Sequence, residues 1–238
     1  MENLQKKYKQ AKEKKYLLTP ALIRHLPKGK KGSTLLDVGS GDGFFFNIAI
    51  EKGYRYYGVD ISEDMIDGSR KDFPKGEFRV ASATSFTKVL KQKFDVIIIN
   101  MVFPCISNKE DFKRIFVEAE KALKDDGIII LGSTHSCFDG YMKVGVLKLG
   151  IDIIDTDFKG YFQSAQKYTV KRNFDGQKFV FEDYHWMISD YVNSITESGM
   201  KLVLMDECKP VDSYSKKDYD FIKKSHKFSI FFIIVIEK

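Results

Sequence analysis

The segment LLDVGSGDGFFF, residues 35–46, constrains the fold of this chain more than any other. An apolar run ends in Asp37, three glycines follow at alternate positions (Gly39, Gly41, Gly43), and three phenylalanines begin at Phe44. Glycine costs conformational entropy on folding, so three within five residues indicate a tight turn that something must approach closely. The segment predicts a strand, a loop and a helix. In an open α/β sheet, ligands bind at turns of this kind.

Apolar runs alternate with amphipathic stretches between residues 34 and 133. The predicted strands span 34–38, 54–60, 77–81, 94–100 and 127–133. The predicted helices span 44–53, 62–73, 85–92 and 111–127, with Ser62 as an N-cap and Gly127 as a helix end. The fourth and fifth strands are apolar on both faces, which is typical of the centre of a parallel sheet. The pattern predicts a doubly wound, Rossmann-like α/β fold.

The pattern changes after residue 133, where periodicity weakens. Residues 168–186 predict a β-hairpin with Asp175-Gly176 as its turn. A helix over 188–199, a strand over 200–208, a lysine-rich helical segment and a strand over 228–238 complete the chain. We therefore expect one domain, 1–238, with an N-terminal helical segment (1–30). An insertion at 136–185, here called the cap segment, would separate strands five and six.

Three nucleotide ligands compete for the glycine loop, Gly39–Gly43. A phosphate-binding P-loop requires a lysine that is absent here. A dinucleotide fingerprint would place its last glycine at Phe44. The acid at the entrance of the loop, Asp37, favours an amino-bearing ligand. Asp60 ends the second strand at the spacing expected for a carboxylate that accepts ribose hydroxyls. Together these residues predict a nucleoside ligand.

The segments LLDVGSGDG, YGVDIS, FDVIIIN and EAEKALKDDGIIIL resemble class I S-adenosylmethionine-dependent methyltransferases of the small-molecule type. The resemblance covers residues 34–133, and the two terminal strands resemble the closing strands of that family's seven-stranded sheet, in which the last strand is antiparallel. It implies S-adenosyl-L-methionine as cofactor and S-adenosyl-L-homocysteine as product.

The resemblance also assigns the site. Asp37 and the glycine loop would face the methionine half, Asp60 the ribose, and Asn100 with Met101 the wall near the reacting methyl. Many members carry an aspartate after the third strand that contacts adenine, but this chain has Ser82 there. The expected cofactor-binding residues are Asp37, Gly39, Ser40, Gly41, Gly43, Asp60, Ile61, Met65, Ser82, Ala83, Asn100 and Met101.

The methyl acceptor would sit over the carboxyl ends of strands four and five, beneath the cap segment. A cap rich in aromatic residues suits the burial of a small or medium-sized organic molecule, methylated on oxygen or nitrogen. Candidate catalytic bases are His135 and His185, and a structural role for His185 is an equal alternative. By resemblance, the first helix crosses the cofactor mouth, where Tyr8 or Tyr16 would touch the methionine carboxylate or simply pack.

Two other functions stay open at this point. The lysine-rich residues 6–15 could dock a protein or RNA substrate, or the chain could be a catalytically silent relative that binds the cofactor. We do not expect nucleic acid, because NMVFPCI lacks the Asn-Pro-Pro-aromatic pattern of enzymes that methylate planar nitrogens. Exposed apolar cap surface could serve a homodimer.

The composition bears on the cellular compartment in which we expect the protein. The three scattered cysteines contain no Cys-x-x-Cys pair, so we expect neither a disulfide framework nor a metal site, and a reducing cytoplasm suits them. No apolar run approaches the ~20 residues of a membrane span. The N-terminus has no hydrophobic region of the signal-peptide kind. We expect a cytoplasmic enzyme that does not contact the membrane.

Overall fold

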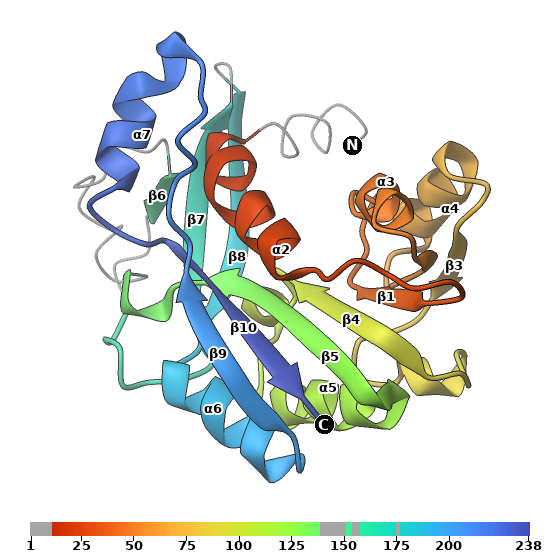
Figure 1. Cartoon of the computed structure of the whole chain (residues 1–238). Coiled ribbons are helices and arrows are strands. Elements are labelled where there is room, and N and C mark those ends of the chain that lie inside the picture. The colour runs from red at the N-terminus through yellow and green to blue at the C-terminus, as the bar shows by residue number, and fades with distance from the viewer. Residues whose placement is uncertain (1–10, 139–150, 154–157, 175–176) are drawn as a thin grey trace.

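The computed structural model describes residues 11–138, 151–153, 158–174 and 177–238. Its main feature is a seven-stranded sheet with the order β3-β2-β1-β4-β5-β10-β9 (Figure 1). The strands of this sheet are β1 (Thr34–Val38), β2 (Arg55–Asp60), β3 (Glu77–Val80), β4 (Phe94–Asn100), β5 (Leu123–Thr134), β9 (Lys201–Glu207) and β10 (Phe231–Glu237). β1 to β5 are parallel, whereas β10 runs antiparallel to both β5 and β9. The predicted doubly wound sheet with an antiparallel last strand is confirmed.

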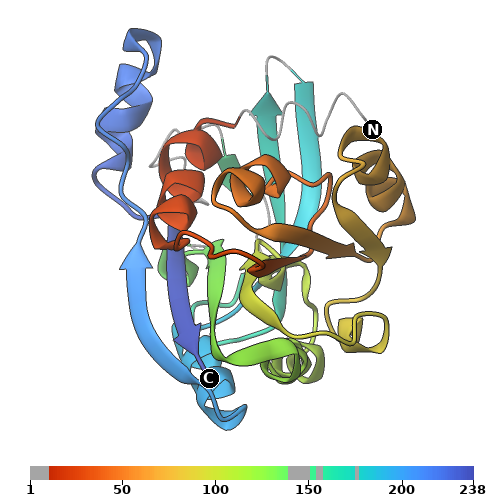
Figure 2. The same cartoon turned by 45° about the vertical axis from the view of Figure 1, so that its right-hand side comes forward.

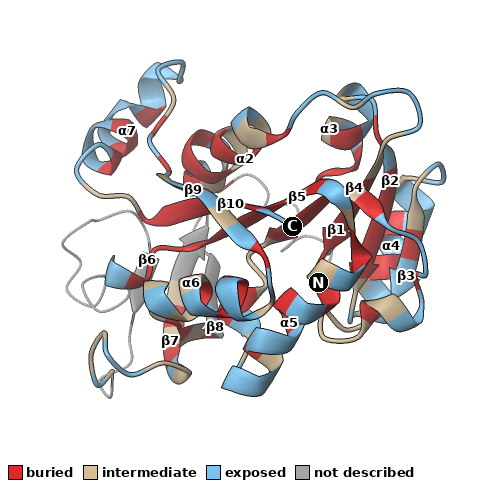
Figure 3. Ribbon diagram, turned by 60° about the horizontal axis from the view of Figure 1, so that its bottom comes forward, coloured by how far each residue is buried: buried red, intermediate tan, exposed pale blue. Residues whose placement is uncertain are grey.

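Helices cover both faces of this sheet (Figure 1). They are the π-helix η1 (Lys14–Leu18), α2 (Thr19–His25), α3 (Phe46–Glu51), α4 (Glu63–Asp72), α5 (Lys109–Ala122) and α6 (Ile188–Glu197). The helix α7 (Tyr219–Ser225) lies beyond the end of the sheet (Figures 1 and 2), where its Phe221 ring contacts Tyr16 of η1. The central strand β4 joins two apolar cores: Val96 and Ile98 pack with η1, α2 and α3, while Ile97 and Ile99 pack with α5 and α6. Figure 3 shows the buried strands between helices whose outer faces are exposed. β4 is therefore apolar on both faces, as its sequence predicts.

Two helix predictions are wrong. Residues 85–92 form only a 3-10 turn, Phe86–Lys88, in which the Glu118 carboxylate accepts the Thr87 backbone N–H at 3.1 Å. α5 ends at Ala122 and not at Gly127, because Leu123 already pairs with Phe94 of β4. Gly127 lies inside β5, where a Cβ atom would come within 3.0 Å of the Phe94 carbonyl oxygen. The predicted N-cap is confirmed, since Ser62 Oγ accepts the Met65 N–H.

A second, three-stranded antiparallel sheet lies in the cap segment, with the order β6-β7-β8. It consists of β6 (Ile151–Ile153), β7 (Gln166–Phe174) and β8 (Gln177–His185). The predicted hairpin is confirmed by the pairing of β7 with β8, whereas its turn, Asp175-Gly176, lies outside the described residues. β8 contacts the 3-10 helix η3 (Phe103–Cys105) that follows β4. Figure 1 shows the hairpin extending beyond the ends of β4 and β5.

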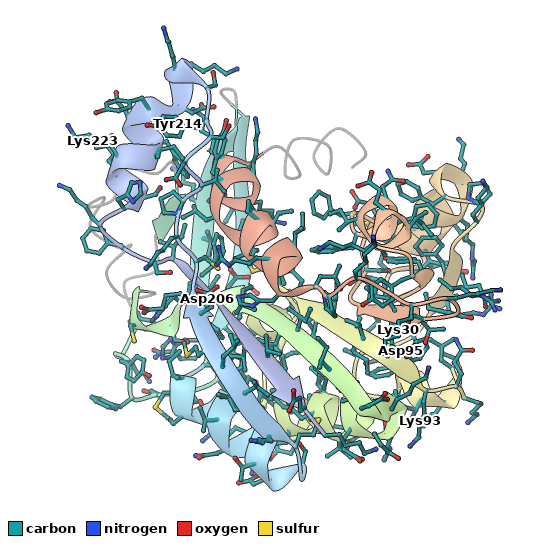
Figure 4. The ribbon with its side chains drawn as sticks, in the orientation of Figure 1. Lys30, Lys93, Asp95, Asp206, Tyr214 and Lys223 are labelled. Carbon is teal, nitrogen blue, oxygen red and sulfur yellow. The ribbon has the colours of Figure 1, made fainter. Side chains whose placement is uncertain are left out.

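Polar side chains connect elements at two places in the sheet, one on β9 and one at the start of β4. Asp206 of β9 accepts hydrogen bonds from Arg24 and from His25 Nε2, which ties α2 to the sheet (Figure 4). Asp95, near the start of β4, accepts the backbone N–H of Thr34 at 2.7 Å and the ammonium of Lys124 at 2.8 Å. These contacts hold the amino ends of β1 and β4 in register and leave their carboxyl ends for the site. Among the described residues, no helix has the length and apolar character needed to cross a membrane.

Candidate active site

A cavity of about 510 Å³ opens at the carboxyl ends of β1 and β4. Seven of the predicted cofactor-binding residues line it: Asp37, Gly39, Ser40, Gly41, Met65, Asn100 and Met101. The other walls come from η1 and the start of α2, from η3, and from Val180–Asp183 of β8. The cavity thus lies between the glycine loop, the N-terminal helices and the cap hairpin.

The glycine loop has the conformation that its sequence predicts. All three glycines have positive φ angles: +73° at Gly39, +52° at Gly41 and +75° at Gly43. A Cβ atom on Gly39 would come within 2.5 Å of Val102 Cγ2, whereas one on Gly41 would meet nothing within 4 Å. Gly39 is therefore required for close packing against the segment after β4. Gly41 leaves open space at the cavity wall, where a ligand can approach the backbone.

The Asp60 carboxylate binds the glycine loop through hydrogen bonds to backbone N–H groups. One carboxylate oxygen accepts the Gly41 N–H at 2.8 Å and the other accepts the Ser62 N–H at 2.9 Å. The carboxylate thus joins the glycine loop to the start of α4.

Five predicted residues do not line the cavity: Gly43, Asp60, Ile61, Ser82 and Ala83. Of these, Ile61 is 75% exposed directly beside Asp60, which is unusual for a large apolar side chain next to a buried strand.

Asp37 is buried at the end of β1, where the Tyr56 hydroxyl donates to its carboxylate at 2.8 Å. Burial raises the pKa of Asp37 to about 7; the Tyr56 hydrogen bond opposes this rise, and the carboxylates of Asp60 and Asp42 add to it. The pKa of Tyr56 lies well above its ordinary value, chiefly because of burial, so its hydroxyl stays protonated and donates. Asp37 can therefore change its charge near neutral pH when a cation approaches.

Two buried polar atoms on the cavity wall have no hydrogen-bond partner among the described residues: Ser40 Oγ and Asn100 Oδ1. Ser40 is only 6% exposed. Buried polar groups are normally hydrogen-bonded, and an exception calls for an explanation such as a ligand. Ser40 Oγ lies close to Gly58 of β2 and Asn100 Oδ1 close to Gly132 of β5, since a Cβ atom on these glycines would come within 2.9 and 2.8 Å of them.

The structure does not bring the two predicted catalytic histidines to the cavity. His135 is buried, with Nε2 2.9 Å from Glu207 Oε1 and its ring edge-on to Phe232. His185 is fully buried, with Nε2 2.8 Å from the Tyr161 carbonyl oxygen. No histidine is among the described residues that line the cavity. Both side chains make contacts within the described fold, and neither is among the residues that line this cavity.

The N-terminal helix does reach the cavity, but not through the predicted tyrosine. Lys14, Leu18 and Thr19 line the wall, whereas the buried Tyr16 hydroxyl donates to Asp218 at 2.7 Å on the other side of the helix. Tyr8 lies outside the described residues. Sequence reasoning also missed the contribution of β8. The segment VFED of β8, residues 180–183, lines the cavity, whereas the sequence predicted only that it forms part of a hairpin in the cap.

The described residues contain no cluster of three or more side chains that could hold a metal ion. The thiol of Cys105 lies on the cavity wall, where burial raises its pKa to about 11 and the carboxylates of Asp183 and Asp60 contribute to the rise. The thiol is therefore protonated at neutral pH and is a poor nucleophile. The described site offers a shaped, charged cavity without a metal cluster or an activated thiolate.

Comparison with known proteins agrees with this geometry. Residues 36–131 match the family model of a methyltransferase domain. An uncharacterized protein of Haemophilus influenzae is 25% identical over 199 residues, which span 79% of this chain and 74% of the relative. The ubiquinone biosynthesis O-methyltransferase of Pelagibacter ubique is 26% identical over 191 residues, which span 74% of this chain and 78% of the relative.

The fold is also found in solved structures. The crystal structure of an S-adenosylmethionine-dependent methyltransferase from Mesorhizobium loti superposes with a TM-score of 0.66 at 20% identity. The match covers 92% of this chain and 96% of that one. It therefore extends beyond the sheet into the cap segment and the terminal strands.

Proposed function

Since the chain is a class I S-adenosylmethionine-dependent methyltransferase, we propose that it methylates a small or medium-sized organic molecule on oxygen or nitrogen. The observation that carries this proposal is the cavity, which is bounded by the glycine loop on one side and by β8 of the cap on the other. Its volume of about 510 Å³ is within the range of small-molecule sites, roughly 300–1,000 Å³. The similarity to an O-methyltransferase of ubiquinone biosynthesis supports an organic acceptor.

The open face of Gly41 on the cavity wall fits the cofactor. We assign Asp37 to its ammonium group, because a buried carboxylate with a pKa near 7 gains most from a cationic partner. Asp60 has spare lone pairs for the ribose hydroxyls besides the two N–H groups that it accepts. Ile61 and Met65 would pack on adenine, with Ser82 and Ala83 nearby. Gly39, Ser40, Gly41 and Gly43 would shape the methionine half, with Asn100 and Met101 beside it.

When bound, the cofactor supplies an electrophilic methyl group, so the protein contributes position and environment. The apolar wall formed by Leu18, Phe44, Phe45, Met101 and Phe181 excludes water from the reacting groups. Asn100 can orient an acceptor at the end of β4. With both histidines engaged elsewhere, we propose that alignment of the acceptor, rather than an imidazole base, makes the main contribution.

The test is a methyl-transfer assay that follows S-adenosylhomocysteine formation with a panel of small organic acceptors, and with RNA and protein fractions in parallel. We expect turnover with members of the small-molecule panel alone. Turnover that requires RNA or protein would support the docking function of the lysine-rich N-terminus instead. Cofactor binding without turnover on any acceptor, including a metabolite extract, would support a silent relative.

A further inference from the structure

Met101, the first residue after β4, has a backbone conformation that is unusual for a residue with a side chain. Its φ angle is +58°, in the left-handed region, and the only other described non-glycine residue with a positive φ is Ala165. A residue with a Cβ atom is strained in this region, and such a conformation persists only where the surrounding structure determines it. Strained residues of this kind cluster at functional sites. Met101 lines the cavity, whereas Ala165 does not.

Two contacts hold the backbone at Met101. Its N–H donates to the Gly132 carbonyl oxygen of β5 at 2.8 Å, which extends the pairing of β4 with β5 by one residue. The next residue, Val102, packs against the glycine loop so closely that a Cβ atom on Gly39 would lie 2.5 Å from Val102 Cγ2. Neither contact uses the side chain of Met101. The strained turn is therefore determined by the main chain where β4 meets the glycine loop.

The Met101 carbonyl oxygen keeps most of its hydrogen-bonding capacity. Among the described residues, the group that donates to it is the Cys105 thiol, 3.9 Å away, and a thiol is a weak donor. A carbonyl oxygen has two lone pairs, so at least one remains for a ligand. The contact is exposed, and both residues line the cavity. The cavity wall therefore presents a backbone acceptor at the end of β4.

The surroundings of Cys105 place this carbonyl oxygen where several elements meet. The pKa of the Cys105 thiol is raised chiefly by burial and then by the carboxylates of Asp183 and Asp60, whereas Lys14 opposes the rise. These three charged groups belong to β8, to the end of β2 and to η1, so the thiol lies within reach of all three elements. The methyl acceptor is expected over the same end of β4, where its donor groups would meet the Met101 carbonyl oxygen.

Building on the proposed methyl transfer, we propose that the backbone carbonyl of Met101 accepts a hydrogen bond from the very atom that is methylated. The methyl acceptor is then an alcohol, a phenol or an amine that is uncharged when bound and carries a hydrogen on its nucleophilic oxygen or nitrogen. Met101 acts here through its main chain, and its left-handed φ directs the carbonyl oxygen toward the acceptor. Carboxylates, phenolates and tertiary amines carry no such hydrogen and are disfavoured.

This hydrogen bond strengthens while the methyl group is transferred. A lone pair of the oxygen or nitrogen forms a bond to the methyl carbon as the carbon–sulfur bond breaks, and the electron pair of that bond stays on sulfur. The positive charge moves from sulfur to the methylated atom, which makes its hydrogen a stronger donor, and the proton then leaves to water. A carbonyl oxygen at this position therefore stabilises the transition state more than the ground state. An ether product has no hydrogen for Met101, which favours its release.

The first test uses the wild-type protein saturated with S-adenosylhomocysteine. Phenol, aniline and 2-naphthol carry the hydrogen, whereas fluorobenzene and 2-fluoronaphthalene share their skeletons without it, and the small fluorine atom excludes a steric cause. Calorimetry measures the affinity of each compound. We expect the hydrogen-bearing compounds to bind at least about 3-fold more tightly, as one net hydrogen bond predicts. Equal affinities, tighter binding of the fluoro compounds, or no binding of any hydrogen-bearing compound would overturn the inference.

Two variants of Met101 separate the role of its backbone from that of its side chain. Met101→Ile keeps an apolar side chain, but a β-branched residue rarely adopts a left-handed φ. Met101→Asn changes the chemistry of the side chain and tolerates this φ. The preference for hydrogen-bearing compounds should therefore stay above about 2-fold in Met101→Asn and disappear in Met101→Ile. The reverse order would assign the preference to the side chain and overturn the inference.

Ala165→Val is the matched control, because Ala165 also has a left-handed φ, of +60°, but does not line the cavity. This variant should lower the free energy of unfolding and leave the preference unchanged. The affinity of the wild-type protein for S-adenosylhomocysteine reports separately on the proposed function. If that affinity is intact and the preference is absent, only this inference fails. If the wild-type protein does not bind S-adenosylhomocysteine, the proposed function fails as well.

Discussion

The glycine loop and the cap hairpin form opposite walls of one cavity, but they are built in different ways. The loop relies on its backbone: positive φ angles at Gly39 and Gly41, and the Gly41 and Ser62 N–H groups that donate to the Asp60 carboxylate. The hairpin is held by contacts between residues far apart in sequence, such as the bond from Trp186 Nε1 to the Ile106 carbonyl oxygen at 3.1 Å. We infer that changes in the loop will affect cofactor affinity, and that changes in the cap will affect acceptor choice and stability.

The largest effect is expected for Gly39→Ala. The left-handed φ costs about 1–2 kcal/mol for alanine, and the new Cβ would overlap Val102. Displacement of the loop should weaken S-adenosylhomocysteine binding at least about 100-fold, a loss of roughly 3 kcal/mol. Gly41→Ala should also weaken binding, because its Cβ would occupy the space assigned to the ligand. Gly32→Ala is the matched control: Gly32 also has a left-handed φ and open space but does not line the cavity, so the affinity should be unchanged. The double variant Gly39→Ala/Val102→Ala should recover part of the affinity; wild-type affinity in Gly39→Ala alone would refute the argument.

A smaller effect on the same wall is expected for Asp60→Asn. The amide offers one acceptor where the carboxylate offers two, so either Gly41 or Ser62 loses its charge-assisted bond. We expect cofactor binding to weaken by about 10- to 100-fold in calorimetry, which corresponds to roughly 1.4–3 kcal/mol. Asp64→Asn, an exposed residue in the first turn of α4, is the control. Equal affinities of the two variants would mean that Asp60 serves only as a helix-start residue.

Asp37 should make the stability of the free protein depend on pH. Its pKa is about 7 in the fold and 3.8 ordinarily, so the folded chain binds the proton more tightly between these values. The contribution of the protonated form is therefore complete below pH 3.8 and is lost as pH rises through 7, by up to roughly 4 kcal/mol. In Asp37→Asn the amide oxygen still accepts the Tyr56 hydrogen bond, but the side chain does not ionise, so the variant does not lose stability as the pH rises through 7. Relative to wild type, the variant should gain stability from pH 5 to pH 8 in denaturant titrations; a constant difference would contradict the assignment.

The same residue should link cofactor binding to proton release. If the ammonium group of the cofactor pairs with ionised Asp37, affinity should rise with pH through about 7, and binding near pH 6.5 should release protons. Calorimetry in two buffers of different ionisation enthalpy measures this release. Binding without proton release, or equal pH dependence in Asp37→Asn, would show that Asp37 has no cationic partner.

The smallest effect is expected in the cap. The Tyr161 hydroxyl accepts the Ile188 N–H at 3.1 Å, at the start of α6. Tyr161→Phe removes this acceptor and should lower the free energy of unfolding by about 1 kcal/mol, with cofactor affinity unchanged. Tyr214→Phe, on the exposed segment before α7 (Figure 4), is the control with no expected change. A large loss of cofactor affinity in Tyr161→Phe would remove the distinction between the two walls.

The same distinction explains what the sequence could predict. The five parallel strands, the glycine loop and the position of Asp60 can be predicted from the sequence, because hydrophobic periodicity and glycine spacing are visible within a few residues. The turn at Phe86–Lys88, found where a helix over 85–92 was predicted, is bound by Glu118, which lies 31 residues from Thr87. The end of α5 depends on the pairing of Leu123 with Phe94. Contacts at such separations leave no local signal.

The orientations of His135 and Tyr16 likewise depend on distant partners. His135 follows β5 as expected, but it shares the face of Ser133, which bonds to Tyr191 of α6 at 2.9 Å. Residues two apart on a strand point to the same side, so its ring packs on Phe232. Tyr16 has its hydroxyl on Asp218, a residue 202 positions away. Which side of an element faces the cavity was set by partners that the local sequence does not identify.

The most direct test of the central claim, that the glycine loop and Asp60 build a cofactor site, is calorimetric titration of the purified chain with S-adenosylmethionine and S-adenosylhomocysteine. We expect each to bind one site with a Kd between about 1 μM and 1 mM, the range of typical enzyme–substrate affinities, and NAD not to bind. Loss of binding in Gly39→Ala and weakened binding in Gly41→Ala, with retention in Gly32→Ala, would locate the site at the loop. Absence of binding of both ligands, or equal binding of NAD, would contradict the account.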